Sequence, residues 1–524
     1  MINKIVDRHP YRRMQSGLMV SFIISVIFFF WCSPAPLTDG QYGMLTPPAK
    51  ASPHINGPVK YGIRPGSPFL YRIPCTGQRP IVFSAENLPE DLVLDPASGI
   101  IFGVIDRAGE YEVTLVSKNK YGSDSRKFDI VAGDRLALTP PMGWNSWYIH
   151  YNRVSDKLMR GAADQMDASG MADYGYQYVN IDDCWMVKDD SNDPEIGGNP
   201  RDRDGRLIPN KRFPDMAGLA RYIHSLGLKA GIYISPGPRT CGGYEGSYGH
   251  EALDAKTFTE WGFDFLKYDW CSYGELVTPK TREDFMKPYL KMSAELKKQP
   301  RDIVLNLCQY GMGNVWEWGG EAGQCWRTTG DLGLEKGSDL PGFYQIGFSN
   351  AAHGSFARPG AWNDPDYILI GTVGDANNMG MGHPTTLTHN EQYSYMSMWC
   401  LMAAPLIFSG DMSKLDAFTL NVLCNSEVID VDQDPLGRQA RIISKTGEEF
   451  ILAKDMEDGS KAVGLFNLTN KLSRITLDLN LIGIDSPVKM HDLWRQTDIS
   501  TIKNRYQTWI PAHGVSLVRT QPVR

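Results

Sequence analysis

The pattern of hydrophobic and polar residues changes twice along this 524-residue chain. Between residues 59 and 133, apolar and polar positions alternate in short runs separated by turn residues such as Asp95, Pro96 and Gly99. Period-two alternation broken by turns is typical of antiparallel strands. It predicts strands at 69–73, 81–84, 111–116 and 127–131, and a strand, turn and strand over 94–103. We therefore predict an immunoglobulin-like β-sandwich over residues 59–133.

A different pattern begins near Leu136, where short apolar runs alternate with longer segments of helical period. Helices are predicted at 154–169, 213–226 and 390–402. The predicted strands are 142–147, 176–181, 228–234, 263–269, 303–307, 324–327, a seventh ending in 362–366, and 406–409. Eight strands with intervening helices over about 300 residues predict a (β/α)8 TIM barrel, which we assign to residues 134–433.

Antiparallel patterning returns at about residue 434. Strands are predicted at 449–454, 461–468, 475–479, 488–494 and 515–519. They predict a C-terminal antiparallel β-sandwich over residues 434–524. The expected fold is thus a multidomain α/β chain, in which a TIM barrel is flanked by an N-terminal Ig-like β-sandwich and this second sandwich.

The N-terminus has the pattern of an export signal. Arg12 and Arg13 precede a short apolar run over 18–31, and small residues follow Cys32. Residues 1–33 are therefore predicted to be a signal peptide of a periplasmic, cell-surface or extracellular protein. Cys32 could carry a lipid anchor, but the bulky residues 29–31 before it favour simple cleavage. The Pro-, Gly- and Ala-rich residues 34–58 are predicted to form a linker.

The composition of the chain indicates which classes of ligand it could bind. The net charge is -7 and basic residues form no block, which argues against nucleic acid. Aromatic residues make up 11% of the chain and suit sugar rings, although they equally suit core packing. No CxxC or HExxH pattern occurs, so we expect no metal and no cofactor. Residues 202–205 resemble half of a calcium loop but lack its distal Glu, so a turn is predicted.

Polar residues cluster just after the barrel strands, and these strand ends share one rim. Two carboxylates on that rim, Asp269 and Asp331, are the minimum for hydrolysing a glycosidic bond. Lys267 shares a strand face with Asp269 and would keep it ionised. Asp331 follows Gly330 and has no adjacent cation after Arg327, which makes it the better acid. Either Asp alone could equally be a helix cap or a loop turn.

Five motifs together carry a family resemblance. They are Gly143-Trp144-Asn145-Ser146-Trp147, Asp182-Asp183-Cys184-Trp185, Lys267-Tyr268-Asp269-Trp270-Cys271, Arg327-Thr328-Thr329-Gly330-Asp331 and Trp362-Asn363-Asp364-Pro365-Asp366. In this order, from about residue 138 onward, the chain resembles the family 27 glycoside hydrolases, the α-galactosidases. The segment before it resembles the immunoglobulin-like modules found ahead of bacterial glycosidases.

The resemblance implies a retaining mechanism with Asp269 as nucleophile and Asp331 as acid/base. It implies that Asp182 and Asp183 hold the sugar's O4 and O6 hydroxyls, and that Lys267 holds O3 and O4. The remaining implied substrate-binding residues are Trp147 and Tyr233 lining the pocket, Arg327 reaching O2, Cys308 and Gln309 near C2, and Asp366 closing one side. A rim salt bridge is the alternative for Asp182 and Asp183, and for Trp185 core packing is preferred.

The resemblance also pairs Cys241 with Cys271 in a disulfide. Cys308 and Cys325, at the fifth and sixth strands, are predicted to form a second one. Cys184 is expected to be a free buried thiol.

Two positions depart from the family pattern. Gln309-Tyr310 follows Cys308 where Glu-Trp is common, and Tyr367 stands where a smaller or softer residue is common. An amide both donates and accepts hydrogen bonds, whereas a carboxylate only accepts. We predict an exo-acting α-galactosidase that acts on oligosaccharides or polysaccharides. The alternatives are the same chemistry on β-L-arabinopyranosides, α-N-acetylgalactosaminides or isomalto-type α-glucosides, and a carbohydrate-binding protein without catalysis. The presence of both Asp269 and Asp331 argues against the non-catalytic alternative.

Overall fold

The computed structural model describes residues 43–332, 340–374 and 382–523. The predicted export signal and Cys32 lie outside the described residues. Within the described ranges, no helix has the length and apolar character needed to cross a bilayer.

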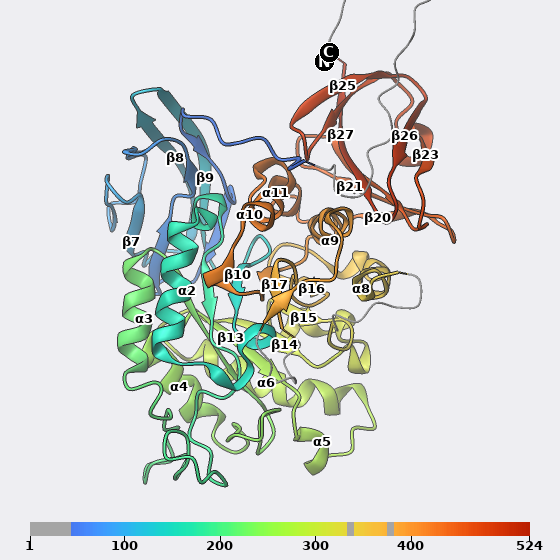
Figure 1. Ribbon diagram of the computed structural model, residues 1–524. Coiled ribbons are helices and arrows are strands. Elements are labelled where there is room, and N and C mark those ends of the chain that lie inside the picture. The colour runs from blue at the N-terminus through green and yellow to red at the C-terminus, as the bar shows by residue number, and fades with distance from the viewer. Residues whose placement is uncertain (1–42, 333–339, 375–381, 524) are drawn as a thin grey trace, which may run out of the picture. The chain divides into compact units, whose positions relative to one another are not determined.

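The N-terminal strands form the two facing sheets of the predicted sandwich and, in addition, a separate antiparallel pair made of the first and fourth strands. Their bounds are β1 His54–Ile55, β2 Lys60–Ile63, β3 Pro68–Arg72, β4 Cys75–Thr76, β5 Val82–Glu86, β6 Leu92–Leu94, β7 Ile100–Val104, β8 Gly109–Asn119 and β9 Gly122–Ala132. One sheet has the order β2-β9-β8-β5 and the other β3-β7-β6, and β8 and β9 pair along their whole length (Figure 1). Alternate residues of β8, including Val113 and Leu115, enter the core, which explains the period of two in the sequence.

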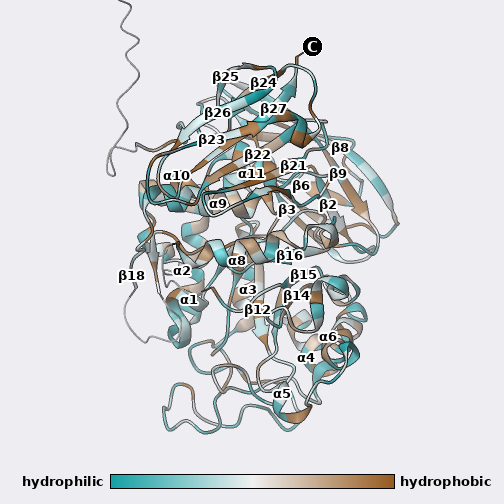
Figure 2. Ribbon diagram, turned by 90° about the vertical axis from the view of Figure 1, so that its right-hand side faces the viewer, coloured by the Kyte–Doolittle hydropathy of each residue, from teal (hydrophilic) through white to brown (hydrophobic). Residues whose placement is uncertain are grey.

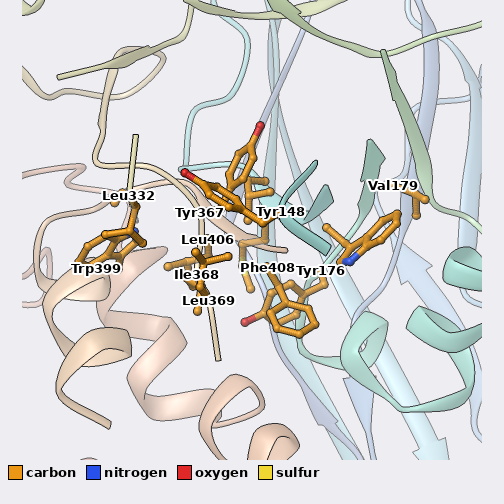
Figure 3. Close-up of a cluster of buried hydrophobic side chains, with 14 of the residues drawn as sticks. Tyr148, Tyr176, Val179, Leu332, Tyr367, Ile368, Leu369, Trp399, Leu406 and Phe408 are labelled. Atoms are coloured by element: carbon orange, nitrogen blue, oxygen red, sulfur yellow. The ribbon is translucent and has the colours of Figure 1, made fainter. Parts of the chain in front are cut away.

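The central domain is the predicted parallel barrel. Its strands are β10 Met142–Asn145, β11 Tyr178–Asn180, β12 Lys229–Ile234, β13 Phe265–Asp269, β14 Val304–Cys308, β15 Cys325–Arg327, β16 Trp362–Asp364 and β19 Leu406–Phe408. From β10 to β16 each strand pairs in parallel with the next, and β19 pairs in parallel with β10. A parallel bridge from Ile368, just beyond β16, to Phe408 of β19 closes the ring. Figure 3 shows Ile368 and Phe408 within the apolar cluster at this closure.

Helices follow the strands and cover the outside of the barrel. They are α1 Trp147–His150, α2 Asp156–Ala168, α3 Met216–Ser225, α4 Glu251–Trp261, α5 Tyr273–Leu276, α6 Arg282–Lys297, α7 Gly319–Ala322, α8 Gly342–Ala351, α9 His389–Leu401, α10 Ala417–Leu423 and α11 Ser426–Asp432. The hydroxyl of Ser155 caps α2 by accepting from the Leu158 N–H, and Gly170 (φ 83°) takes the left-handed conformation beyond its end. A short antiparallel pair, β17 Thr372–Val373 and β18 His383–Pro384, lies between β16 and α9.

The C-terminal domain is the second predicted β-sandwich. Its strands are β20 Arg441–Lys445, β21 Glu449–Asp455, β22 Lys461–Asn467, β23 Ser473–Asp478, β24 Val488–Asp492, β25 Thr497–Ile502, β26 Arg505–Ile510 and β27 Val515–Pro522. The hydrophobic strands β21 and β22 lie inside the larger sheet, whose order is β20-β21-β22-β27-β24-β25 (Figure 2). Against this sheet pack β23 and β26, so that Val463 and Leu477 meet in one core.

A buried arginine fixes the long loop that follows β11. The guanidinium of Arg201 donates to both carboxylate oxygens of Asp254 in α4, at 2.8 and 3.0 Å, and to Glu245 at 2.8 Å. It also donates to the carbonyls of Gly205 and Gly246. These hydrogen bonds connect the loop to α4 and to the segment between β12 and α4.

Replacing Arg201 should destabilise the protein strongly. Arg201→Met leaves the fully buried Asp254 carboxylate without its cation, and breaking a buried pair in this way costs about 3–5 kcal/mol. Thermal unfolding at pH 7 would report this cost as a Tm lowered by several degrees. Lys256→Met, which removes a half-exposed partner of Glu260, is the control and should change the Tm very little. Equal shifts in the two variants would contradict the assigned role of Arg201.

Candidate active site

Strand β13 presents two charged side chains to the barrel interior. All five of its residues are buried, and alternate side chains point to opposite faces of the sheet. Tyr268 packs outward against Tyr289 of α6, with ring centres 5.7 Å apart. Lys267 and Asp269 therefore share the inner face, and Lys267 Nζ lies 3.8 Å from Asp269 Oδ2.

The ammonium of Lys267 is the centre of one half of the site. It donates to Asp182 Oδ2 at 2.9 Å, across to the end of β11. Three aromatic rings face it, with centres 5.1 Å (Tyr233), 5.3 Å (Tyr367) and 5.7 Å (Trp147) from Nζ. Burial lowers the pKa of Lys267, but Asp182 and the other anions outweigh burial, and the pKa is raised well above its usual value. Lys267 is thus a permanent cation that joins four elements of the rim.

Asp182 and Asp183 have different partners. Asp182 forms the salt bridge with Lys267, so the rim salt bridge considered for it is present. Asp183 accepts backbone N–H groups instead, from Cys184 at 2.6 Å and from Gly242 at 2.7 Å. Burial raises the pKa of Asp183 to about 7, against these hydrogen bonds, which lower it. Both carboxyls are held in place without a sugar.

Arg327 is the centre of the other half of the site. Its Nη2 lies 3.2 Å from Asp331 Oδ1 and 3.1 Å from Asp366 Oδ2, and its Nη1 lies 3.8 Å from Cys308 Sγ. Asp366 also accepts from the Tyr148 hydroxyl at 2.7 Å. Arg327 itself therefore supplies a cation to Asp331, next to which the sequence offered no other.

The two candidate catalytic carboxyls differ in environment. The side chain of Asp269 is 6% exposed and that of Asp331 is 61% exposed. Burial raises the pKa of Asp269 to about 6, while Lys267 and the Tyr310 hydroxyl lower it and the charge of Asp331 adds to the rise. Lys267 thus acts in the predicted direction, but burial outweighs it. Asp269 is ionised only above about pH 6.

Several buried polar atoms on the same rim have no partner within the described residues. They are Gln309 Nε2 and Oε1, Arg327 Nε and Asp366 Oδ1. All follow or end β14, β15 or β16, which are neighbours in the barrel. Buried polar groups in native proteins are nearly always hydrogen-bonded. This group of atoms offers both donors and acceptors to a polar ligand.

Four residues of the same rim have a strained backbone. Cys184, Ser272, Tyr310 and Asp366 have φ values of 76°, 56°, 65° and 90°, in the left-handed region. Residues other than glycine rarely adopt this backbone conformation, and those that do are often at functional sites. Each of these residues lies within a few positions of a barrel strand end.

One of the two predicted disulfides forms. Cys241 and Cys271 are bonded, with Cα atoms 5.1 Å apart. The predicted Cys308–Cys325 bond is wrong, because both thiols are free. In the pairing of β14 with β15, Cys325 lies opposite Asn306, so Cys308 is two residues further along and contacts Arg327 instead. Cys184 is free and buried, as predicted.

Trp185, Trp147 and Tyr233 have different surroundings. Trp185 is fully buried and donates from Nε1 to the Tyr233 carbonyl at 2.8 Å, which supports core packing. Trp147 is only partly buried and faces Lys267. The Tyr233 hydroxyl lies 3.5 Å from Cys271 Sγ, beneath the disulfide.

Three tyrosines contribute more than their sequence context suggested. Tyr148 binds Asp366, Tyr310 donates to Asp269 at 2.6 Å, and Tyr367 lies 3.4 Å from Asp182 Oδ2. Figure 3 shows Tyr148 and Tyr367 next to each other, with ring centres 6.0 Å apart. In the sequence they were marked only by where they stand. Tyr148 directly follows the motif residue Trp147, and Tyr310 and Tyr367 occupy the positions that depart from the family pattern.

The described residues contain one grouping with metal-ligand spacing, formed by Cys241, Asp269 and Cys271. The two sulfurs are bonded to each other, so neither is a thiolate ligand. The sequence resembling a calcium loop is a turn, as predicted, in which Asp202 accepts from the N–H groups of Asp204 and Arg206. These residues give no support for a metal site.

Comparison with known proteins matches each part of the chain to a family. Residues 139–434 match the "Alpha galactosidase A" family and residues 446–520 match the "Alpha galactosidase C-terminal beta sandwich domain". Residues 47–133 match an Ig domain family. Similar proteins include α-galactosidase 2 of Arabidopsis thaliana (35% identity, covering 75% of this chain and 92% of the relative) and the α-galactosidase of Coffea arabica (37%, 74% and 95%).

Solved structures with a similar fold include members of the same group of enzymes. A candidate α-galactosidase of Bacteroides fragilis has a TM-score of 0.82 and 36% identity, covering 91% of this chain and 99% of that chain. A β-L-arabinopyranosidase of Geobacillus stearothermophilus has a TM-score of 0.64 and 25% identity, covering 74% of this chain and 97% of that chain.

The raised pKa of Asp269 predicts a pH-dependent cost in stability. The group titrates near 3.8 when unperturbed and near 6 in the folded protein, so folding favours its protonated form. That contribution to stability is complete below about pH 4 and is lost as the pH rises through 6. Asp269→Asn stays neutral and should be more stable than the wild type by about 2–3 kcal/mol at pH 8, a difference that fades toward pH 4.

Chemical denaturation across this pH range measures the effect. Asp106→Asn is the matched control, because this residue is exposed and lies in the N-terminal domain, away from the site, so its replacement should leave stability nearly unchanged. A destabilised Asp269→Asn at pH 8 would show that the ionised form of Asp269 is not under strain.

Proposed function

Because the chain belongs to the α-galactosidase A family, we propose that it is a retaining exo-α-galactosidase with Asp269 as nucleophile and Asp331 as acid/base. The observation that supports this proposal best is the contrast between the two carboxyls. One is buried beside a cation and the other is mostly exposed, yet each is close enough to influence the other. Two carboxyls in different environments are what double displacement requires.

The reaction would proceed in two steps. The ionised Asp269 attacks the anomeric carbon while Asp331 gives its proton to the leaving glycosidic oxygen, which yields a covalent glycosyl-enzyme. Asp331 then takes a proton from water, water attacks the same carbon, and the bond to Asp269 breaks with its electron pair returning to the carboxylate. Two inversions give net retention.

The two halves of the rim would recognise opposite sides of the sugar. Asp182 and Asp183 supply acceptors for O4 and O6, and Lys267 supplies a donor between them and Asp269. On the other side, Gln309 and Arg327 have polar atoms beside Cys308 that no described residue hydrogen-bonds. A hydroxyl at C2 both donates and accepts, which matches an amide with both of its atoms free.

Small external nucleophiles would separate the roles of the two acids. With p-nitrophenyl α-galactoside, Asp269→Gly should lose nearly all turnover, and azide should restore it by giving β-galactosyl azide, because azide replaces the carboxylate in a single inversion. Asp331→Gly should lose about 10²–10⁴-fold on substrates with poor leaving groups and, with azide, give α-galactosyl azide. NMR of the products distinguishes the anomers, and the same anomer from both variants would refute the assignment.

A substrate panel tests the choice of sugar. The wild type should prefer the α-galactoside over the matching β-L-arabinopyranoside, α-N-acetylgalactosaminide and isomaltose. Preference for another member would move the proposal to that sugar, and no turnover of any would favour the non-catalytic alternative.

Gln309 should govern discrimination at C2. Gln309→Ala should reduce kcat/KM for an α-galactoside by about 10- to 100-fold, because hydrogen bonds to the C2 hydroxyl are lost. The same change should have little effect on the 2-deoxy analogue, which has no hydroxyl to bind. Gln309→Glu restores an acceptor but no donor, so its kcat/KM for the α-galactoside should lie between those of the wild type and Gln309→Ala. An equal loss on both substrates would mean that Gln309 acts only through packing.

A further inference from the structure

The hydroxyl of Tyr310 makes the closest side-chain contact with the candidate nucleophile. It donates to Asp269 Oδ1 at 2.6 Å, whereas the other carboxylate oxygen, Oδ2, lies 3.8 Å from Lys267 Nζ. The two oxygens therefore differ, because one accepts a short hydrogen bond from a phenol and the other faces a more distant cation. Within the described residues, Oδ2 is the oxygen that remains available to attack.

Among the described residues, the proton of the Tyr310 hydroxyl has one strong acceptor, Asp269. The other atoms near the hydroxyl are the disulfide sulfurs, Cys241 Sγ at 3.7 Å and Cys271 Sγ at 4.0 Å, which accept weakly. Burial and the charge of Asp269 raise the pKa of Tyr310 far above its usual value. The phenol therefore stays protonated and donates to Asp269 wherever the enzyme is folded.

The backbone holds Tyr310 in this place at an energetic cost. Its φ of 65° is left-handed, which is unfavourable for a residue with a Cβ by about 1–2 kcal/mol. The next residue, Gly311, donates its N–H to the Arg327 carbonyl at 3.1 Å, and a Cβ there would lie 2.4 Å from the Thr328 carbonyl oxygen. The turn is thus pressed against β15, and the strained conformation directs the phenol at Asp269.

We propose that Tyr310 is a positioning residue that sets the protonation state and leaving ability of Asp269. This inference rests on the proposed function. In the first step Oδ2 bonds to the anomeric carbon, the glycosidic C–O bond breaks, and Asp331 protonates the departing oxygen. Oδ1 then becomes the carbonyl oxygen of the ester and keeps the hydrogen bond from Tyr310.

The hydrogen bond matters most in the second step. As water attacks and the bond from carbon to Oδ2 breaks, negative charge returns to the carboxylate and part of it develops on Oδ1. A donor already aimed at that oxygen stabilises the charge in the transition state. In the first step the carboxylate loses charge, so the same bond stabilises the starting state and gives no such gain. Tyr310 therefore favours hydrolysis of the glycosyl-enzyme over its formation.

Tyr310→Phe removes the hydroxyl and keeps the ring. With p-nitrophenyl α-galactoside, kcat should fall about 10- to 100-fold, the range for a lost hydrogen bond to a charged group. KM should fall with it, because the glycosyl-enzyme accumulates, and stopped-flow traces should show a burst of nitrophenol. The acid limb of kcat/KM should move up by about one pH unit, since the donor no longer favours the ionised carboxyl.

A second measurement does not depend on turnover. The pH dependence of the stability difference between the wild type and Asp269→Asn reports the titration of Asp269 directly, and its midpoint should rise when Tyr310→Phe is added to both. Tyr248→Phe removes a hydroxyl from a half-exposed tyrosine outside the site and should change nothing.

The outcomes separate this inference from the proposed function. A Tyr310→Phe variant with an unshifted midpoint, no burst and an unchanged KM would overturn the role of Tyr310 while leaving the hydrolase assignment intact. Failure of the azide experiment on Asp269→Gly would overturn the proposed function itself. A shifted midpoint together with a burst would support the inference.

Discussion

The buried ammonium of Lys267 is the interaction on which the arrangement of the site depends. It lies within 4 Å of two carboxylates, Asp182 just after β11 and Asp269 at the end of β13, which would otherwise repel each other. Charges can be buried only when paired, and breaking such a pair leaves an uncompensated charge in a medium of low polarity. Three rings around the ammonium exclude water and add a favourable contact with the cation. Lys267 thus allows two acidic side chains to lie close together at the buried end of the barrel strands.

Burial accounts for the reactivity proposed for Asp269, and it also lowers the stability of the folded protein. The same loss of hydration that raises the pKa of Asp269 leaves its charged form poorly solvated and ready to form a bond. Asp331, by contrast, stays mostly exposed to water. The left-handed residues around the rim add strain that the packed barrel beneath them can bear. Stability has been given up at the strand ends, where the chemistry is proposed to occur.

Much of this architecture could be predicted, because parallel strands bring their carboxyl ends to one rim whatever their spacing in sequence. That rule is enough to place Lys267, Asp269 and Arg327 on one rim. It could not supply strand register, which is why Cys308 and Cys325 were wrongly paired. Nor could it find β25, whose exposed residues lack any apolar alternation. The pKa of Asp269 also depended on burial by distant segments, which local sequence does not encode.

The two halves of the rim are not equally complete. On the Lys267 side, Asp182 and Asp183 already accept hydrogen bonds from the protein, so a sugar binding there must share groups that are held in place. On the Arg327 side, both amide atoms of Gln309 and Oδ1 of Asp366 have no hydrogen-bond partner in the part of the chain that the structure describes, so a hydroxyl there gains hydrogen bonds at no expense to existing ones. A ligand lacking that hydroxyl leaves those atoms unpaired, and unpaired buried groups are penalised more than paired ones are rewarded. Discrimination should therefore be steepest at C2, where this chain departs from the family pattern.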